Sequence, residues 1–307
     1  MKILRHAGPA GDVALAIGSF DGVHLGHQAM LAHVVRAARE RNLASAAVTF
    51  EPLPREFFAP GEAPARLSSL VEKLGLIAEA GIDGTIVERF NRKFAAIPPA
   101  EFEARIALHY RARWVMIGQD FRYGAGRRGD VASLKAAGAR LGYEVHVLPA
   151  VELDGARVSS TRVREALAAA DFPKAARLLG RPYAICGRVV HGRKRGRDMG
   201  FPTANVRLSR PRAAVSGIFA VRCIGVATRG LEGVASLGIN PALQDGGPAT
   251  LEAYLFDFSG DLYGRRISLE FVKKLRDEAH FASLDELAAQ IRRDCDAARE
   301  IFRTLPR

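Results

Sequence analysis

Short apolar runs alternate with longer amphipathic stretches along the first half of the chain. The apolar runs have the length of β-strands, and the stretches between them repeat apolar residues at helical spacing. Strands that alternate with helices are typical of βαβ units, which assemble a parallel sheet. We predict strands at Ala14–Ile17, Ala46–Phe50, Gly84–Val87, Trp114–Ile117 and Glu144–Leu148, and helices at about Gln28–Glu40, Ser69–Glu79, Ala100–His109 and Val131–Leu141. This half is therefore expected to be a doubly wound α/β domain.

The pattern changes in the second half, where short runs rich in Val, Ile, Phe and Tyr are separated by Gly, Pro and Asn. Such spacing predicts an antiparallel β-barrel. We predict strands at Ala184–Val190, Gly217–Ile224, Leu231–Leu237, Thr250–Phe256 and Arg266–Val272. A last run, Ser283–Arg303, has helical spacing, and Ser283 and Glu286 have the separation of a capping box. The turn Gly180-Arg181-Pro182 predicts a boundary between domains 1–181 and 182–307.

Composition agrees with two domains, since 307 residues exceed the usual size of one. The chain contains no apolar run long enough to span a bilayer and no signal peptide, so we expect a cytoplasmic protein. The three cysteines lie far apart without a CxxC pair, which supports neither a disulfide framework nor a zinc site. The net charge of +12 is compatible with nucleic acid, an anionic membrane or phosphorylated ligands, and equally with a solvated Arg-rich surface.

The first candidate site lies between a predicted strand and a predicted helix, in the segment Gly18–His27. Backbone amides at a helix N-terminus favour phosphate, and the helix dipole adds to this preference. His24 and His27 are three residues apart, so their rings are expected on one face, where they could donate to the phosphates of ATP. Gly22 and Gly26 have no side chain, so they would let the nucleotide approach the backbone closely. Taken alone, an HxxH pair is more often two surface histidines of a turn.

The neighbouring sequence makes this segment more specific. Gly18–His27 resembles the HxGH-type signature of nucleotidyltransferases, in the GxFDGVHxGH form of the FAD synthetase module. Three further segments are similar to that module: Thr49–Pro54 to TFEPHP with Leu53 in place of a common His, Gly118–Gly129 to GxDFxFGxxRxG, and Ser159–Arg164 to SSTxxR. The resemblance covers most of residues 14–165 and implies a Rossmann-like nucleotidyltransferase domain.

This resemblance implies adenylyl transfer, in which the phosphate of FMN attacks the α-phosphorus of ATP in line. The protein then acts mainly by positioning and charge stabilisation. His24 and His27 would be the catalytic residues, and Asp120 and Phe121 would contact flavin. The implied nucleotide-binding residues of this half are Gly18, Phe20, Asp21, Gly26, Ser160, Thr161 and Arg162.

The second candidate site follows a β-like run in the barrel half, where a glycine-rich basic loop leads into the turn Pro202-Thr203-Ala204-Asn205. Glycine amides and basic side chains could cradle the phosphates of ATP. Neither a Walker motif nor the HRD and DFG motifs of protein kinases occur. The basic cluster Arg193–Arg197 alone would favour nucleic acid, but the segment Phe201–Asn205 argues for another function.

The segment Gly187–Asn205 closely resembles the riboflavin kinase signature GxVxxGxxxGRxxGFPTAN, and Gly217–Ala220, Gly238–Pro241 and Leu262–Gly264 are supporting matches. The resemblance implies Mg²⁺ contacts from Thr203 and Asn205, and a general base in Glu252, a carboxylate in an otherwise apolar strand. Two simpler interpretations stay open: a Thr203 hydroxyl bonded within its own turn, and a Glu252 exposed on the outer face of its strand. The remaining implied contacts are Gly192 and Arg197 for nucleotide, and Asn240 and Arg276 for flavin, with Phe281 near Arg276.

Together the motifs resemble the bacterial bifunctional riboflavin kinase and FAD synthetase family. That family makes FMN from riboflavin and ATP, then FAD and pyrophosphate from FMN and ATP, with Mg²⁺ expected in both steps. We expect small-molecule substrates, no nucleic-acid or membrane partner, and leave self-association open. Two alternatives remain: a monofunctional adenylyl- or cytidylyltransferase whose barrel only binds flavin, and a nucleic-acid-binding protein favoured by the high pI.

Overall fold

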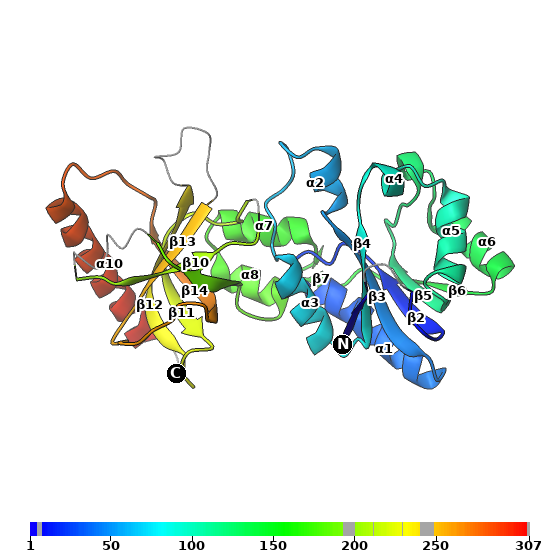
Figure 1. Ribbon diagram of the computed structural model, residues 1–307, viewed down its shortest axis with the longest axis horizontal. Coiled ribbons are helices and arrows are strands. Elements are labelled where there is room, and N and C mark those ends of the chain that lie inside the picture. The colour runs from blue at the N-terminus through cyan, green and yellow to red at the C-terminus, as the bar shows by residue number, and fades with distance from the viewer. Residues whose placement is uncertain (5–7, 193–199, 211, 229, 240–248, 306–307) are drawn as a thin grey trace. The chain divides into compact units, whose positions relative to one another are not determined.

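The computed structural model of the chain describes residues 1–4, 8–192, 200–210, 212–228, 230–239 and 249–305 (Figure 1). Contacts divide the chain into two units. The first comprises Met1–Pro64 with Leu70–Ser160, and the second comprises Ala65–Ser69 with Thr161–Arg307. In the described part of the chain, no helix combines the length and the apolar character needed to cross a membrane.

A six-stranded parallel sheet forms the first unit, with strand order β1-β4-β3-β2-β5-β6. Its strands are β1 (Lys2–Leu4), β2 (Val13–Ile17), β3 (Ala44–Glu51), β4 (Gly84–Arg89), β5 (Ala112–Gly118) and β6 (Glu144–Leu148). From β2 the chain runs outward through β3 and β4, then crosses to the opposite side of β2 to form β5. The order of strands therefore reverses between β2 and β5, and ligands of such sheets bind beyond the carboxyl ends of the strands at this point.

Helices cover both faces of the sheet. Ala14 and Ala16 of β2 pack in one core with α1 (Leu25–Glu40) and α3 (Leu70–Glu79), whereas Val13, Leu15 and Ile17 pack in another with α5 (Pro99–Leu108) and α6 (Val131–Leu141). Burial on both faces explains why β2 is a continuous apolar run. The shorter elements of the unit are α2 (Pro54–Phe58), α4 (Arg92–Ala95), the 3-10 turn η1 (Ala125–Arg127), and the hairpin of β7 (Glu152–Leu153) and β8 (Ala156–Arg157).

The second unit is built around a closed antiparallel barrel with strand order β10-β13-β12-β11-β14-β9 (Figure 1). Its strands are β9 (Ala184–Val190), β10 (Thr203–Arg207), β11 (Gly217–Ile224), β12 (Leu231–Ile239), β13 (Ala249–Leu255) and β14 (Arg266–Arg276). The helices α7 (Ser160–Ala168) and α8 (Phe172–Leu179) precede it. The ring of Phe172 packs against Phe219 and Phe271 of the barrel, with centroids 5.8 and 6.1 Å away.

The last helix, α10 (Leu284–Thr304), packs against the outside of the barrel. Ile218, Ala220 and Val234 meet Cys295, Ala298 and Phe302 in this contact. Strand residues next to them in sequence, such as Phe219 and Ala235, are fully buried and fill the barrel interior. Alternation along the strands therefore separates an interior face from an outer face.

The predicted fold class, an α/β domain with a parallel sheet followed by an antiparallel barrel and a closing helix, is confirmed. One local prediction is wrong: Thr203–Asn205 belongs to strand β10, not to a turn. Its outer-facing residues are polar, and its pattern therefore lacked the β-branched run by which strands are recognised. The boundary after residue 181 stays a prediction, because grouping by contacts does not test where two functional modules meet.

Candidate active sites

The segment Gly18–His27 continues from the carboxyl end of β2, beside the carboxyl end of β5. Two hydrogen bonds attach its start to β3: Gly18 N donates to Val48 O at 3.1 Å, and Thr49 Oγ1 donates to Ser19 O at 3.2 Å. We call this segment the phosphate loop. It lies at the strand reversal, where the fold places a ligand site.

The backbone of the phosphate loop adopts left-handed conformations at Phe20 (φ 49°), Gly22 (φ 79°) and Val23 (φ 41°). This region suits glycine but strains a β-branched residue, at a typical cost of about 1–3 kcal/mol. Phe20 and Val23 are buried, at 0% and 1% exposure, and this burial holds the turn in place. Because its ring is buried, any nucleotide contact of Phe20 would come from its backbone.

The two histidines lie against each other, as their spacing predicted. Their rings stack with centroids 3.8 Å apart and an interplanar angle of 17°. His24 is the N-cap of α1, and its Nδ1 accepts the backbone N–H of His27 at 3.4 Å. A neutral ring whose Nδ1 accepts a hydrogen bond carries its proton on Nε2, so Nε2 is a donor.

The His27 ring is neutral at physiological pH. Burial, the neighbouring His24 and the positive charge of Lys73 together lower its pKa well below the usual 6.5. Its Nδ1 is buried and has no hydrogen-bond partner among the described residues. With no acceptor near Nδ1, the single proton of the ring belongs on Nε2, and both histidines then present an Nε2–H donor.

Further predicted nucleotide contacts belong to the same loop. A Cβ on Gly26 would lie 3.2 Å from the His24 ring, and one on Gly18 would lie 3.2 Å from the Phe20 ring. The Asp21 residue is buried, and its carbonyl accepts the Ser160 hydroxyl at 3.0 Å. The structure therefore brings Ser160 to the phosphate loop. The remaining two residues, Thr161 and Arg162, follow in the first turn of α7 and group with the second unit.

The predicted flavin contacts Asp120 and Phe121 follow directly after β5. Asp120 is exposed and is paired with Arg157 of β8. The half-buried Phe121 ring stacks on Tyr123, with centroids 5.7 Å apart and an interplanar angle of 24°. Tyr123 is fixed in turn by its hydroxyl, which donates to the buried Glu103 at 2.6 Å. These supporting residues were not predicted, although Tyr123 stands where the family pattern has Phe.

Four predicted residues of the kinase site meet on the barrel. Asn205 of β10 pairs directly with Glu252 of β13, and the Thr203 hydroxyl donates to Glu252 Oε2 at 3.3 Å. Gly192 lies against the Asn205 amide so closely that a Cβ on it would overlap the amide atoms. The structure thus assembles one carboxylate, one amide and one hydroxyl beside a glycine backbone.

Glu252 points away from the barrel interior. Its neighbours in sequence, Leu251 and Ala253, are buried in that interior, each at 1% exposure. On the outer face Glu252 is half-buried and pairs with Ser236 on one side and Asn205 on the other. The apolar sequence of the strand therefore belongs to the opposite face, and the surroundings of the carboxylate are polar.

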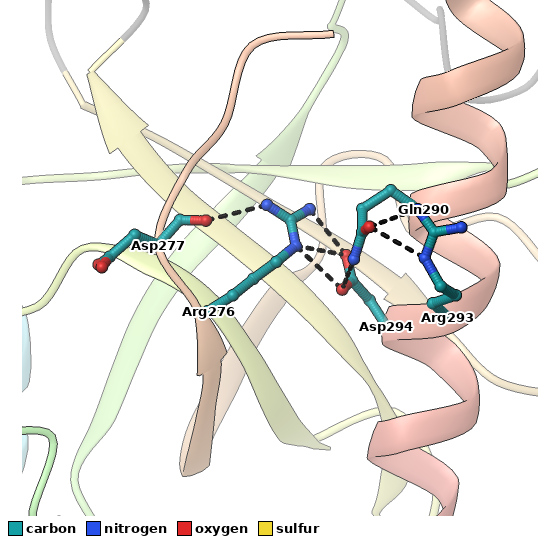
Figure 2. A network of polar contacts seen from close by, with 5 residues as sticks. All are labelled: Arg276, Asp277, Gln290, Arg293 and Asp294. Carbon is teal, nitrogen blue, oxygen red and sulfur yellow. Dashed lines mark hydrogen bonds and ion pairs between the residues drawn. The ribbon is translucent and has the colours of Figure 1, made fainter.

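Arg276, the last residue of β14, is held by α10 (Figure 2). Its Nε donates to both carboxylate oxygens of Asp294, at 3.0 and 3.2 Å, and its Nη2 donates to Asp294 Oδ2 at 2.8 Å. Its Nη1 donates to the Asp277 carbonyl at 2.9 Å, and its guanidinium lies over the Phe281 ring at 5.6 Å. Asp294 is buried and also accepts from Gln290 at 2.9 Å.

This arrangement refines the prediction for Arg276. A guanidinium that binds a buried carboxylate with two nitrogens first of all joins the end of β14 to α10. The other two predicted barrel contacts, Arg197 and Asn240, lie outside the described residues.

Comparison with known proteins assigns a family to each half. Residues 8–162 match the family model described as FAD synthetase, and residues 179–302 match the one described as riboflavin kinase. A curated Escherichia coli protein named bifunctional riboflavin kinase/FMN adenylyltransferase is 45% identical over 98% of both chains. A Pseudomonas fluorescens protein of the same name is 46% identical over 93% of this chain and 91% of its own.

A solved structure is similar as well. It is described as a macrolide-efflux protein from Streptococcus pneumoniae, is 28% identical, covers 100% of both chains and has a TM-score of 0.81. That description concerns the other protein, whereas the two family models and the curated relatives agree with one another on riboflavin kinase and FAD synthesis. The chain belongs to the family of bifunctional riboflavin kinase/FMN adenylyltransferases.

Proposed function

We propose that this bifunctional transferase makes FAD from riboflavin in two ATP-dependent steps, with His24 and His27 serving adenylyl transfer and Glu252 serving phosphorylation. The substrates are riboflavin, FMN and ATP, and FAD is the final product. The observation that carries the proposal is the presence of two separate polar assemblies. One lies at the strand reversal of a parallel sheet, and the other lies on the outer face of a barrel.

In the first unit, the phosphate of FMN attacks the α-phosphorus of ATP, and the bond to the leaving pyrophosphate breaks. No residue of the chain needs to form a covalent bond in this reaction. The phosphate loop contributes the N-terminus of α1 and the Nε2–H donors of His24 and His27, which stabilise the negative charge that develops on the phosphate oxygens. A neutral His27 suits this role, because two stacked imidazolium rings would repel each other.

Ser160, Thr161 and Arg162 stay proposed triphosphate contacts by resemblance. Ser160 bonds to the carbonyl of Asp21, which supports its place beside the loop. Arg162 has the planar donors suited to two phosphate oxygens at once. Asp120 and Phe121 are proposed flavin contacts, with the half-buried Phe121 ring as the surface on which an isoalloxazine would stack.

In the barrel, the 5′-hydroxyl oxygen of riboflavin attacks the γ-phosphorus of ATP, and Glu252 accepts the hydroxyl proton as ADP leaves. The Thr203 hydroxyl donates its only proton to Glu252 Oε2 and so orients the carboxylate. Because Gly192 has no side chain, its backbone can lie against the Asn205 amide. A side chain at this position would exclude a phosphate group. Arg197 and Asn240 remain proposed contacts by resemblance.

The donor set on the barrel fits Mg²⁺. Thr203 and Asn205 offer neutral oxygen atoms next to the Glu252 carboxylate, and hard cations prefer oxygen ligands. Since the Thr203 proton is directed at Glu252, the lone pairs of its hydroxyl oxygen remain for a cation. Bound there, Mg²⁺ would supply positive charge for the phosphate oxygens of ATP.

The first site is tested by His27→Gln, which removes a ring donor from the phosphate loop. We expect the variant to lose FAD formation from FMN and ATP while it keeps FMN formation from riboflavin. His33→Gln is the matched control, because His33 lies on the same helix and bonds to Arg36 instead. FAD formation by His27→Gln at the rate of the control would refute the role of this ring.

The second site is tested by Glu252→Gln, which keeps the shape of the side chain and removes the base. Riboflavin phosphorylation should fall by about 10²–10⁴-fold, the usual contribution of a general base. Glu232→Gln on the neighbouring strand β12 is the control, since Glu232 is exposed. Retention of FMN production by Glu252→Gln would show that another group takes the proton.

A further inference from the structure

A lysine lies buried beside the phosphate loop. Lys73 belongs to α3, and its side chain is fully buried, at 0% exposure. Lysine is almost never fully buried, because removing an ammonium group from water is costly unless polar groups receive it. Its Nζ donates to the hydroxyl of Thr49 at 3.2 Å. The sequence placed Thr49 in a family motif without giving it a role.

Thr49 connects this lysine to the phosphate loop. Its hydroxyl has one proton, which it donates to the carbonyl of Ser19 at 3.2 Å. Its lone pairs accept from Lys73, which has only protons to offer. Thr49 is fully buried in β3, so the chain Lys73–Thr49–Ser19 fixes the start of the loop from within the unit.

Lys73 also acts on the site electrostatically. The charged or titratable groups that lower the pKa of His27 are His24, from the same helix turn, and Lys73, from α3; burial of the ring acts in the same direction. The positive charge of Lys73 therefore helps to keep His27 neutral. A fixed positive charge beneath the phosphate loop attracts anions to the surface of the loop. The attraction is strong because the buried Lys73 side chain is shielded from water.

We propose that Lys73 is a positioning residue for adenylyl transfer, which holds the phosphate loop through Thr49 and supplies the fixed positive charge below the ATP phosphates. The inference rests on the proposed function of the phosphate loop and deepens it. A buried lysine with a purely structural role would affect stability but would not change the affinity for ATP.

The test is Lys73→Met in the full-length chain, with adenylyl transfer measured over a range of ATP concentrations. We expect the KM for ATP to rise about tenfold or more, which corresponds to about 1.4 kcal/mol, while riboflavin phosphorylation keeps its wild-type rate. NMR titration should show the His27 midpoint moving to higher pH, because removal of a nearby positive charge favours the protonated ring. Lys135→Met, which removes an exposed lysine from α6, is the matched control.

A second variant, Thr49→Val, decides the question if Lys73→Met does not fold. It removes the hydroxyl between Lys73 and Ser19 and keeps the charge, so the KM for ATP should rise while His27 remains neutral. Wild-type KM values in a folded Lys73→Met, or in Thr49→Val when Lys73→Met does not fold, would overturn the proposal. If the proposed function of the phosphate loop itself were wrong, His27→Gln would keep FAD synthesis. The two failures can therefore be distinguished.

Discussion

The contact between Arg276 and Asp294 allows a quantitative prediction. Asp294 is 5% exposed, and Asp294→Asn preserves its shape while removing the charge that the guanidinium binds. Breaking a buried ion pair typically costs about 3–5 kcal/mol. The Arg276 side chain is 22% exposed, so water can compensate part of this loss, and we expect about 2–3 kcal/mol. Arg276→Met should cost a similar amount, because it leaves the Asp294 carboxylate buried.

Urea denaturation can measure this effect on the second unit separately. Trp114 is the only tryptophan of the chain and lies in β5, so its fluorescence reports on the first unit. Circular dichroism reports on both units. Asp294→Asn should therefore shift the circular-dichroism transition assigned to the barrel and leave the fluorescence transition in place. A control is Asp257→Asn, whose exposed pair with Arg299 also joins the barrel to α10 and should contribute at most about 1 kcal/mol.

The double variant, Arg276→Met with Asp294→Asn, tests the reasoning most strictly. Since neither partner is then left buried with an unbalanced charge, its cost should be clearly smaller than the sum of the single costs. Additive costs would refute the account of the pair. If instead Arg276→Met raises the KM for riboflavin and leaves stability unchanged, Arg276 acts as a flavin contact rather than as a link to α10.

Three further predictions follow from single residues. Gly192→Ala should abolish riboflavin phosphorylation and spare FAD formation from added FMN, because the new Cβ overlaps the Asn205 amide; assays of each step check this. Tyr123→Phe should destabilise the first unit by about 1–3 kcal/mol in denaturation monitored by Trp114, because the buried Glu103 loses the donor at 2.6 Å. The pKa of His27 is lower in the folded protein than in the unfolded chain, where it is about 6.5. As the pH falls below 6.5, His27 therefore binds a proton more readily in the unfolded chain. The free energy of unfolding of the first unit should therefore fall below that pH, and His27→Gln should reduce this dependence.

Much of the fold was predictable because its periodicity is local. The strand Glu144–Leu148 and the helix Val131–Leu141 match their predictions, and the helix is bounded by an Asp130 N-cap and by Gly142 in a left-handed conformation. At Ser283 the predicted capping box is half present: its side chain accepts from Glu286 N, whereas the Glu286 carboxylate binds the backbone of Ala282.

The supporting residues of the sites were harder to predict. Lys73 looks like part of the polar face of an amphipathic helix, and only the packed structure shows that this position faces the sheet and Thr49. Arg276 and Asp294 lie on different elements, so neither spacing nor propensity relates them. Motifs identify residues that meet a ligand, whereas the partners that fix those residues depend on tertiary contacts.

The central claim is that one chain holds two independent sites that act in sequence through FMN. The most direct test incubates His27→Gln and Glu252→Gln, separately and mixed, with riboflavin, ATP and Mg²⁺, and separates the flavin products. We predict FMN alone from His27→Gln, at most traces of flavin product from Glu252→Gln, and FAD from the mixture, because FMN released by one variant serves the other. A His27→Gln variant that forms no FMN, or a mixture that forms no FAD, would contradict the claim.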